Sequence, residues 1–461
     1  MKALTRSNNT STLVLRFALF SAVVAVVGVW VALYASSALA LILLCASLIL
    51  ILLIVVPLSV LPAIALVLFA VVPFAHMGLP GIVGRFFTAP VLVLSVWCIR
   101  SQFERRLKTL PLHFACILAL ILFVLALETI TSSDLYVSAM WTGCLVLALV
   151  YPVYVAKSTA VSDQSKRNLS LAVAVSSCII GAAALSEFVL GWNPWYLVFS
   201  SEALSREWSV FRAKSSLGHP LPTMTLAVFC ITFLLFDRTV GKGTRYAGVV
   251  LGVTALLLTV SRSGVIALIS GVVVGGLVGI TSGSSEQRRS AIFGLGGTAI
   301  VGAILLSSPL LETRSSSLEG IDSASVRTLL VDQSIELFKE RPSLGLGPGV
   351  SGDFFENNYG VILENSVFQA LLSIGVVGLL ALGLFFLAGF WQPLQSGSSS
   401  AVGAAVAYLV AISGFNAFDT LPSTLMLLAV AVLSSGAPKL RGSDDSDPPR
   451  TQCLEDGATT R

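Results

Sequence analysis

The sequence predicts an all-α fold, a polytopic membrane helix bundle of about 12–14 transmembrane helices with two longer loops on its outer face. The first observation is composition: the 461-residue chain is 55% hydrophobic and only 11% charged, and its mean hydropathy is +0.90. A soluble domain carries about 25% charged residues, so this chain has too few to cover a surface that faces water. The second observation is a series of long apolar runs, and the third is where the basic residues lie between them.

The same composition excludes several classes of protein. A soluble enzyme, a disordered protein or a nucleic-acid-binding protein would need far more charged residues. The net charge of +4 is too small to indicate an acidic partner. Six of the seven cysteines lie in apolar runs, and none has a metal-ligand spacing such as C-x-x-C, so we interpret these six as small apolar side chains.

Fourteen apolar runs approach the roughly 20 residues that a membrane-spanning helix needs. They lie at about 13–34, 38–55, 57–74, 84–99, 110–128, 134–156, 168–190, 218–236, 246–261, 263–280, 290–308, 366–390, 401–416 and 420–434. Pro57 and Pro62 interrupt the stretch 38–74, which fits either two crossings or one crossing and a re-entrant piece. Because the run at 84–99 is also short, both 14 and 12 crossings are compatible with the sequence, and an even number is favoured.

The two ends of the chain are both predicted to be cytoplasmic. Lys2, Arg6 and Arg16 accompany the first apolar run, which is too long for a cleaved signal peptide and is followed at once by more apolar sequence. We interpret this run as an uncleaved signal anchor. After Pro438 the chain is short and polar, which is typical of disorder. The predicted organisation is a membrane domain over 1–435 and a disordered cytoplasmic tail over 436–461.

The orientation follows from the basic residues, which are enriched in cytoplasmic loops. With the N-terminus in the cytoplasm and 14 crossings, 19 of the 28 Lys and Arg residues fall on the inner side. Of the 24 Asp and Glu residues, 15 fall on the outer side. The bias runs along the whole chain, and it predicts a multi-pass protein of the inner or plasma membrane with both termini inside.

The first long outer loop spans about 191–217 and is rich in aromatic residues. Such a density suits a segment that lies in the headgroup layer of the membrane. The aromatic residues are Trp192, Trp195, Tyr196, Phe199, Trp208 and Phe211. Among them lie three basic residues, Arg206, Arg212 and Lys214.

The second long outer loop spans about 309–365. A helix is predicted over 325–340, with Ser323 or Ser325 as its N-cap and Pro342 ending it. The stretch Gly345-Leu346-Gly347-Pro348-Gly349 then predicts a turn, and Glu364-Asn365 stands just before the next apolar run.

A third feature is Ser261-Arg262-Ser263-Gly264, which joins two apolar runs with almost no linker. The predicted topology places Arg262 at the outer membrane boundary. A charge there is costly unless it is paired or faces a water-filled cavity. The alternative is an arginine that extends its side chain into water beside a tight turn.

Together and in this order, these features resemble the O-antigen ligase/polymerase superfamily of integral-membrane glycosyltransferases. The family pattern has an S-R-(S/G)-G motif, then an outer loop with an Arg-bearing helix, P-x-x-G-x-G and a His-Asn dipeptide, then an L-x-x-x-G-x-x-G helix. The matching residues are Ser261–Gly264, Arg327, Pro342–Gly347, Glu364-Asn365 and Leu372–Gly378. Upstream, Gly218-His219-Pro220 resembles the family's G-H-P segment, so the resemblance covers about 205–385.

The resemblance implies transfer of a glycan from a polyprenyl diphosphate carrier to a hydroxyl acceptor, a glycan or a lipid, on the outer face of the membrane. It implies catalytic roles for Glu364 and Asn365, and places His219 near the site. Many members have His where this chain has Glu364, and that histidine is the family's proposed general base. A carboxylate also accepts a proton, so we expect Glu364 to be the base and Asn365 to orient the acceptor or the carboxylate.

The predicted chemistry needs no metal and no cofactor. Negative charge develops on the departing diphosphate, and the planar guanidinium of arginine binds phosphate oxygens in a bidentate manner. Arg262, Arg327 and Arg212 are the predicted diphosphate-binding residues. The outer loops contain no D-x-D motif and no His cluster.

Each of these residues also has a structural interpretation. Arg327 fits a solvated helix charge paired with Glu319 or Asp322. Glu364 fits an N-cap of the helix that follows, although Glu is a poor cap. His219 fits a polar group at a helix start before a proline.

Two rival functions remain. A polysaccharide or lipid transporter, or a flippase, predicts ionisable residues in mid-membrane and an internal repeat, and neither is evident. A membrane scaffold leaves the outer arginines and Glu364-Asn365 without a role. Ligase and polymerase share these motifs, so the sequence alone does not distinguish them, and it does not show the sugar or the linkage.

Overall fold

The computed structural model describes residues 55–77, 86–104, 108–199, 202–205, 210–282, 285–306 and 318–435. All regular elements in these residues are helices, which confirms the predicted all-α class. Among the described residues, five helices are long and apolar enough to cross a membrane, and four shorter ones are apolar. The predicted crossings at 13–34 and 38–55 and the predicted tail at 436–461 lie outside these residues.

The first half of the described chain coincides with the predicted runs. Its helices are α3 (Leu61–Val71), α4 (Phe74–Met77), α6 (Ala89–Glu104), α7 (Leu112–Ile130), α8 (Leu135–Leu145), α9 (Tyr151–Ser158) and α10 (Asp163–Leu190). A π-helical turn, Val146–Val150, joins α8 to α9, where Pro152 lacks the N–H group that a regular helix needs.

The second half begins with the short helices of the first outer loop. These are α11 (Tyr196–Phe199), α12 (Glu202–Ser205) and a 3₁₀ turn (Ser215–Leu217). Four bundle helices follow, α13 (Pro220–Phe236), α14 (Lys242–Leu258), α15 (Arg262–Ser282) and α16 (Ser285–Leu306). The remaining elements are α18 (Leu318–Glu340), α19 (Val350–Tyr359), α20 (Ser366–Gln395), α21 (Ser399–Ser413), α22 (Ala417–Thr420), a 3₁₀ turn (Pro422–Leu425) and α23 (Met426–Ser434).

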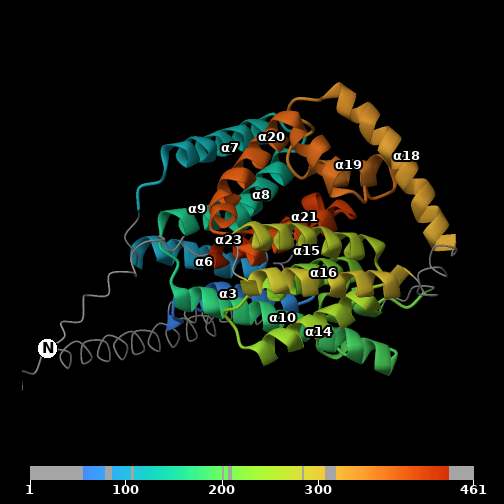
Figure 1. Cartoon of the computed structure of the whole chain (residues 1–461). Coiled ribbons are helices and arrows are strands. Elements are labelled where there is room, and N and C mark those ends of the chain that lie inside the picture. Colours follow the sequence, from blue (N-terminus) through green and yellow to red (C-terminus); the bar gives the residue numbers. More distant parts are fainter. Residues whose placement is uncertain are drawn as a thin grey trace, which may run out of the picture.

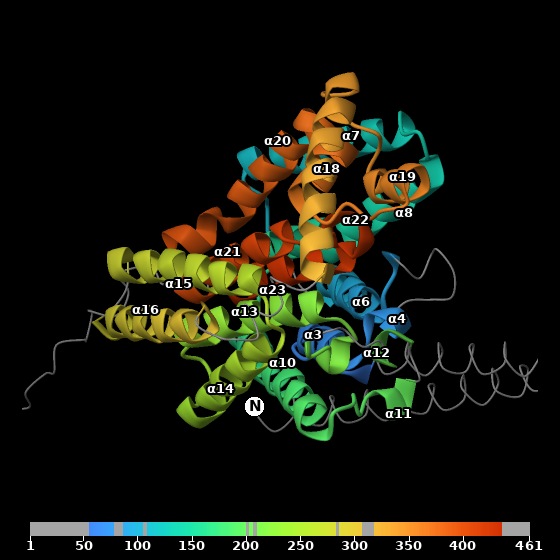
Figure 2. The ribbon, with the colours of Figure 1, turned by 90° about the vertical axis from the view of Figure 1, so that its right-hand side faces the viewer.

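The bundle has two parts. In Figures 1 and 2, α7, α8, α18, α19 and α20 form the upper part, and α3, α10, α14, α15 and α16 form the lower part. Helices α21 and α13 are packed against α15 and carry much of the apolar core. Glycines allow the closest crossings, because a Cβ atom at Gly181 would overlap Leu251 of α14 and one at Gly271 would overlap Ala407 of α21.

Contacts between distant parts of the chain sort the predicted loops into two groups. Connections predicted to be outer contact one another, and so do those predicted to be inner. The outer contacts are Ser133 with Leu346, Arg212 with Thr259, and Ser366 with Phe415. The inner contacts are Arg100 with Val56, Lys157 with Gln392, and Asn168 with Ser59.

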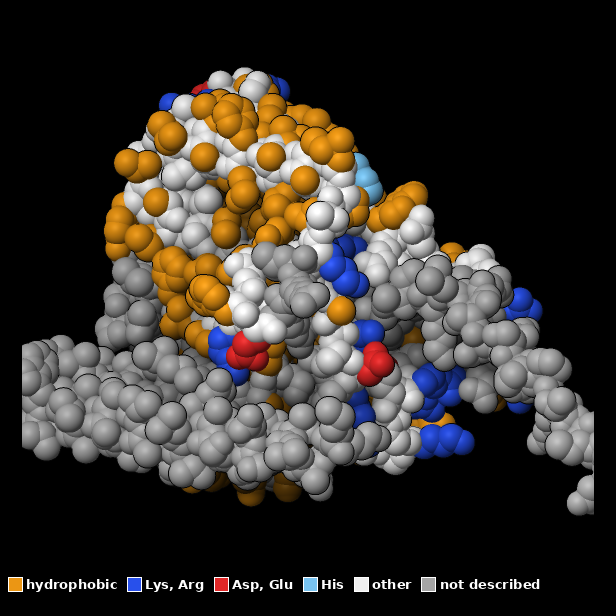
Figure 3. Space-filling model, turned by 90° about the vertical axis from the view of Figure 1, so that its left-hand side faces the viewer, with side chains coloured by type: hydrophobic (Ala, Val, Ile, Leu, Met, Phe, Trp, Pro, Cys, Tyr) orange, Lys and Arg blue, Asp and Glu red, His pale blue; other side chains and the backbone are white. Residues whose placement is uncertain are grey.

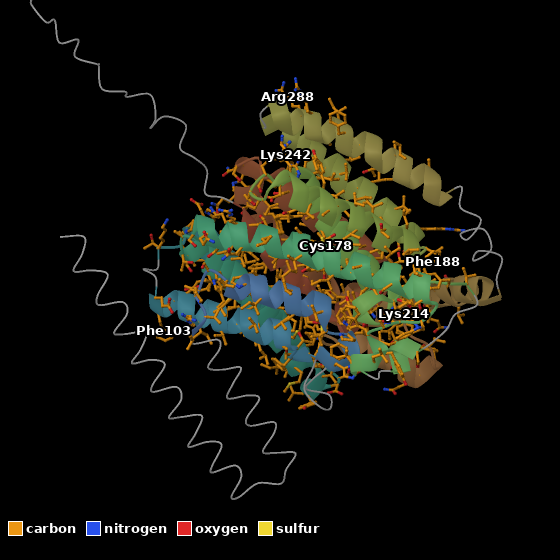
Figure 4. All side chains as sticks on the ribbon, turned by 90° about the horizontal axis from the view of Figure 1, so that it is seen from below. Phe103, Cys178, Phe188, Lys214, Lys242 and Arg288 are labelled. Atoms are coloured by element: carbon orange, nitrogen blue, oxygen red, sulfur yellow. The ribbon has the colours of Figure 1, made fainter. Side chains whose placement is uncertain are left out.

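The two groups lie at opposite ends of the bundle. In Figure 4, Phe103, Lys242 and Arg288 lie toward one end, and Phe188 and Lys214 lie toward the other, with Cys178 between them on α10. Figure 3 shows the end at which α10 begins, where Lys and Arg side chains are visible beside few Asp and Glu side chains. Which of the two ends faces the cytoplasm stays a prediction.

The helix of the second outer loop is longer than the sequence predicted. Helix α18 begins at Leu318, seven residues before the predicted start, so the prediction of Ser323 or Ser325 as its N-cap was wrong. Apart from one glycine, the segment 318–324 contains no residue that breaks a helix, so nothing forces a start at the serines. The predicted end is confirmed, because α18 stops at Glu340, two residues before Pro342.

Candidate functional site

The connection from α14 into the start of α15, residues 259–264, is strained and is called the Arg262 turn below. Helix α14 ends at Leu258 and α15 begins at Arg262, whose side chain is exposed. Val260 has a φ of +50°, a conformation that β-branched residues rarely adopt. Such backbone strain persists only when the surroundings enforce it, and it concentrates at functional sites. Gly264 allows the turn to pack closely, because a Cβ atom there would overlap Met224 of α13.

Arg212 is brought to this turn by the first outer loop. Its Nε donates a hydrogen bond to the carbonyl of Thr259 at 3.2 Å, and the N–H of Ala213 donates to the carbonyl of Leu258 at 2.9 Å. The loop therefore satisfies carbonyls at the end of α14 that have no partner inside the helix. Arg212 therefore contacts the turn that carries Arg262, and the shared role of the two arginines stays a prediction.

His219 stands at the start of α13 and forms its N-cap. Its side-chain nitrogen Nδ1 accepts a hydrogen bond from the N–H of Leu221 at 3.3 Å, and the residue is exposed. This is the helix-start position that the structural interpretation of His219 predicts. The same end of α13 carries Met224, which packs under the Arg262 turn, so His219 belongs to the same end of the bundle as Arg262.

The Glu364-Asn365 pair stands at the start of α20, and the two residues have different environments. Asn365 is the N-cap: its Oδ1 accepts hydrogen bonds from the N–H groups of Val367 at 2.9 Å and Phe368 at 3.2 Å. The structural interpretation of Glu364 as the cap is therefore wrong, because a shorter side chain already fills that position. Glu364 is half-buried immediately before the cap.

The Arg262 turn and the start of α20 meet at one turn between α21 and α22. A Cβ atom at Gly414 would lie 3.0 Å from Ser263 Cβ, so the Arg262 turn contacts Gly414. The next residue, Phe415, accepts a hydrogen bond from the hydroxyl of Ser366 at 2.6 Å. Two motifs about 100 residues apart in the sequence are therefore neighbours across this turn.

Gln369 and Asp419 fix the backbone just before Glu364, and sequence reasoning missed both. The side-chain amide of Gln369 donates to the carbonyl of Leu363 at 3.1 Å and accepts from the N–H of Asp419 at 3.2 Å. Asp419 in turn accepts from the hydroxyl of Ser373 at 2.8 Å. Asp419 and Gln369 are fully buried. An Asp inside an apolar stretch, at position 419, was the signal that could have indicated this network.

The P-x-x-G-x-G segment of the second loop and the L-x-x-x-G-x-x-G segment of α20 pack together through backbone hydrogen bonds. Helix α20 is broken at Gly375, which has φ +59° and ψ −171°. The carbonyls freed before the break accept hydrogen bonds from the loop, and the N–H groups freed after it donate to the loop. The four bonds are Leu346 N–H to Leu372 O (2.8 Å), Gly347 N–H to Ser373 O (3.0 Å), Val376 N–H to Pro342 O (3.0 Å) and Val377 N–H to Ser343 O (3.1 Å).

Only glycine permits this fit at two positions. A Cβ atom at Gly345 would overlap the carbonyls of Leu372 and Ser373, and one at Gly375 would overlap the carbonyl of Ser343. The P-x-x-G-x-G segment is therefore docked into the break of the L-x-x-x-G-x-x-G helix. Helix α19 follows the docked loop directly, so the segment between α19 and α20 that carries Glu364 is held from both sides.

Arg327 lies on α18, and its side chain lies outside the described residues. Further along α18, Leu330 is buried in a small apolar cluster with Phe355 of α19 and Leu372 of α20. This contact ties the middle of α18 to the first half of α20. Arg206, the third basic residue of the first loop, and the acidic partners suggested for Arg327 also lie outside the described side chains.

One region of the chain matches a known family. Residues 247–383 match the family described as O-antigen ligase (Wzy_C). This part of the chain is similar to that family. The matched region contains the Arg262 turn, Arg327, both glycine motifs and Glu364-Asn365, and the resemblance read from the sequence is thereby confirmed. No match to the chain was found among curated proteins.

The extent of the match separates the candidate residues into two groups. Arg212 and His219 precede residue 247, so their assignment rests on their contacts with the Arg262 turn and α13 rather than on the family match. The similarity of residues 247–383 to this family favours a membrane enzyme of the glycosyltransferase type. In the described part of the chain, no group of three or more His, Cys, Asp or Glu side chains lies close enough to hold a metal ion.

Proposed function

We propose that this protein is a membrane glycosyltransferase that moves a glycan from a polyprenyl diphosphate carrier to a hydroxyl acceptor on the outer face of the membrane. One observation carries the proposal most directly. Inside the region similar to O-antigen ligase, the Arg262 turn and the start of α20 contact neighbouring residues, Gly414 and Phe415, at the end of the bundle that gathers both long loops. The segments that carry Arg262 and Glu364 therefore contact the same turn, which supports a shared site.

The proposed reaction is a displacement at the anomeric carbon of the glycan. The acceptor hydroxyl oxygen forms the new glycosidic bond, and its proton passes to the Glu364 carboxylate. The bond between the anomeric carbon and the diphosphate oxygen breaks, and the electron pair leaves with the lipid diphosphate. Arg262, Arg327 and Arg212 stabilise that charge through bidentate hydrogen bonds, and this mechanism uses no metal ion.

Asn365 acts in this scheme as a positioning residue. Its oxygen holds the first turn of α20, and its backbone carbonyl accepts from the N–H of Gln369 at 2.9 Å. The same Gln369 side chain holds the carbonyl of Leu363. Glu364 is therefore bracketed by two residues whose backbones are fixed, which favours one orientation of the carboxylate.

The proposed orientation places both termini in the cytoplasm and the site on the periplasmic or extracellular face. It can be tested by labelling intact cells with an impermeant thiol reagent in a Cys453→Ser background. Cysteine at position 320, in the second loop, should react. Cysteine at position 440 should stay unlabelled until the membrane is permeabilised, and labelling of position 440 on intact cells would exclude this orientation.

The alternative is a polysaccharide or lipid transporter or flippase. Ionisable residues on a transport path lie near the middle of the membrane. The two buried glutamates of the described apolar spans lie elsewhere: Glu128 is two residues from the end of α7, and Glu187 is three residues from the end of α10. Their positions near helix ends favour the enzyme.

Deletion of the gene tests the function and separates its two forms. A polymerase adds a growing chain to the next repeat unit, so its loss should abolish long surface glycans while single repeats remain attached. A ligase transfers a finished glycan to a final acceptor, so its loss should abolish attached glycan while lipid-linked chains accumulate. An unchanged profile of surface and lipid-linked glycans in the deletion strain would reject both forms.

A further inference from the structure

A pocket of about 450 Å³ lies beside the Arg262 turn, between the end of α10 and the first outer loop. Ligand pockets commonly measure about 300–1,000 Å³ and combine apolar walls with a few fixed polar groups. This pocket has both kinds of wall. Its aromatic side consists of Trp192, Tyr196 and Phe211, and its charged side of Glu187, Arg212 and Lys214.

The charged side is rigidly built around Glu187. The buried carboxylate of Glu187 accepts hydrogen bonds from the N–H groups of Lys214 at 2.9 Å and Ser215 at 2.8 Å, and from the Asn193 amide at 3.0 Å. The Lys214 ammonium lies 3.6 Å from the same carboxylate. One carboxylate thus fixes the loop that carries Arg212.

Ser215 carries backbone strain at this point, with a φ of +56°. Among the described residues other than glycine, only Ser215 and Val260 have positive φ, and the segments that contain them are joined by the Arg212–Thr259 hydrogen bond. Strain that is enforced at two contacting places indicates a site whose geometry matters.

The aromatic side is open to the surface at the end of α10, a helix long and apolar enough to cross a membrane. Trp192 is 45% and Tyr196 42% exposed, although both line the pocket. The surrounding surface is apolar and consists of Phe188, Val189, Leu190, Leu197 and Val198, all exposed. Figure 4 shows Phe188 and Lys214 at the same end of the bundle. A ligand with an apolar tail can therefore reach this pocket from the lipid.

We infer that this pocket holds the sugar residue next to the diphosphate of the lipid-linked donor, an inference that rests on the proposed function. The apolar face of a pyranose ring packs on exposed aromatic rings such as Trp192 and Tyr196, which a bare phosphate does not need. Arg212 lies between the pocket and the Arg262 turn and binds the phosphate nearest the sugar. The isoprenoid tail then leaves over the apolar surface at the end of α10.

Equilibrium binding to the purified full chain in lipid nanodiscs tests this inference with two probes. One probe is farnesyl diphosphate, and the other is farnesyl diphosphate that carries a single N-acetylglucosamine. The wild-type protein should bind the sugar-bearing probe more tightly. Trp192→Ala and Tyr196→Ala should each weaken binding of the sugar-bearing probe by about two- to tenfold and leave farnesyl diphosphate binding unchanged. Arg212→Gln should weaken binding of both probes.

Two further variants keep the test decisive. Trp192→Leu retains apolar volume but removes the ring, so it replaces Trp192→Ala in the binding test if the alanine variant fails to fold. Trp391→Ala removes a tryptophan of similar exposure, 58%, near the other end of α20, and should bind both probes like the wild type.

Three results would overturn the inference: equal binding of both probes by the wild type, unchanged binding by the Trp192 and Tyr196 variants, or equal loss for both probes in those variants. The last result would mean that the aromatic residues contact the isoprenoid tail, which both probes share. The proposed function is tested by a different experiment. A normal glycan profile in the deletion strain would reject that function, independently of how the two probes bind.

Discussion

The two long loops predicted to be outer, residues 191–217 and 309–365, are fixed to the bundle in different ways in the parts that the structure describes. In the first, one buried carboxylate, Glu187, collects hydrogen bonds from the loop and pairs with Lys214. In the second, backbone groups of the loop pair with backbone groups freed at the break of α20. The first loop therefore depends on a charge, and the second depends on the absence of side chains at Gly345 and Gly375.

The two loops also differ in whether they lie within the family match. The backbone-paired loop lies inside the O-antigen ligase match, and the carboxylate-fixed loop lies before it. In the second loop, hydrogen bonds between backbone groups hold the segment that carries the general base of the proposed reaction. These bonds do not depend on the neighbouring side chains.

The largest expected effect concerns the chemistry of the second loop. Glu364→Gln keeps the shape of the side chain and removes the proton acceptor. General-base catalysis contributes about 10²–10⁴-fold, so glycan transfer should fall by that factor while the protein still binds the lipid-linked donor. Turnover by the purified variant, measured with the donor bound, checks this. Glu364→His should restore part of the activity, because imidazole is also a base.

The matched control is Glu356→Gln, on α19 in the same loop and exposed. It should transfer glycan at the wild-type rate. If Glu364→Gln retains at least half the wild-type turnover, Glu364 is not the base, and His219 becomes the next candidate because it stands at the same end of the bundle.

The next effect tests the charge that fixes the first loop. Glu187→Gln leaves Lys214 buried without its opposite charge, and breaking a buried pair in this way costs about 3–5 kcal/mol. Thermal unfolding should therefore occur at a clearly lower temperature than in the wild type. The control is Glu104→Gln, which removes the more exposed pair with Arg100 and should cost only about 0–1 kcal/mol. Equal stability of the two variants would mean that the carboxylate does not fix this loop.

A smaller effect tests the backbone pairing of the second loop. Gly375→Ala forces a side chain into a backbone conformation that is essentially restricted to glycine and against the Ser343 carbonyl, at a cost of about 1–3 kcal/mol. The control lies in the same helix: a Cβ atom at Gly383 meets no atom within 4 Å, so Gly383→Ala should be neutral or slightly stabilising. Measured unfolding free energies in which both alanines behave alike would contradict this pairing.

The smallest predicted effect concerns the predicted diphosphate contact on α18. Arg327→Lys keeps the charge but loses the bidentate fork. The loss of one charge-assisted hydrogen bond, about 1.5 kcal/mol, corresponds to roughly tenfold lower transfer, with normal accumulation in the membrane. Arg341→Lys, an exposed arginine of the same loop, is the control and should be fully active. Near-normal transfer by Arg327→Lys would make this residue an ordinary solvated helix charge.

The sequence predicted the helices far better than it predicted the loops between them. Apolar runs of membrane-spanning length leave few alternatives to a helix, because lipid offers no partner for backbone polar groups. In the second loop, composition constrained the chain less. The sequence missed α19 and began α18 seven residues late, since serine and aspartate at positions 322–325 fit a cap as well as a helix interior.

The sequence by itself determined the apolar helices, the end of α18 just before Pro342, and the motifs that resemble the family, because each depends on neighbouring residues alone. Tertiary structure decided which of those motifs meet. Only packing joins Ser263 and Ser366 through the turn at Gly414 and Phe415, and only the docked loop shows why Gly345 and Gly375 are both glycines. The buried network of Gln369 and Asp419 has the same origin, since polar groups far apart in the chain become partners only where folding removes them from water.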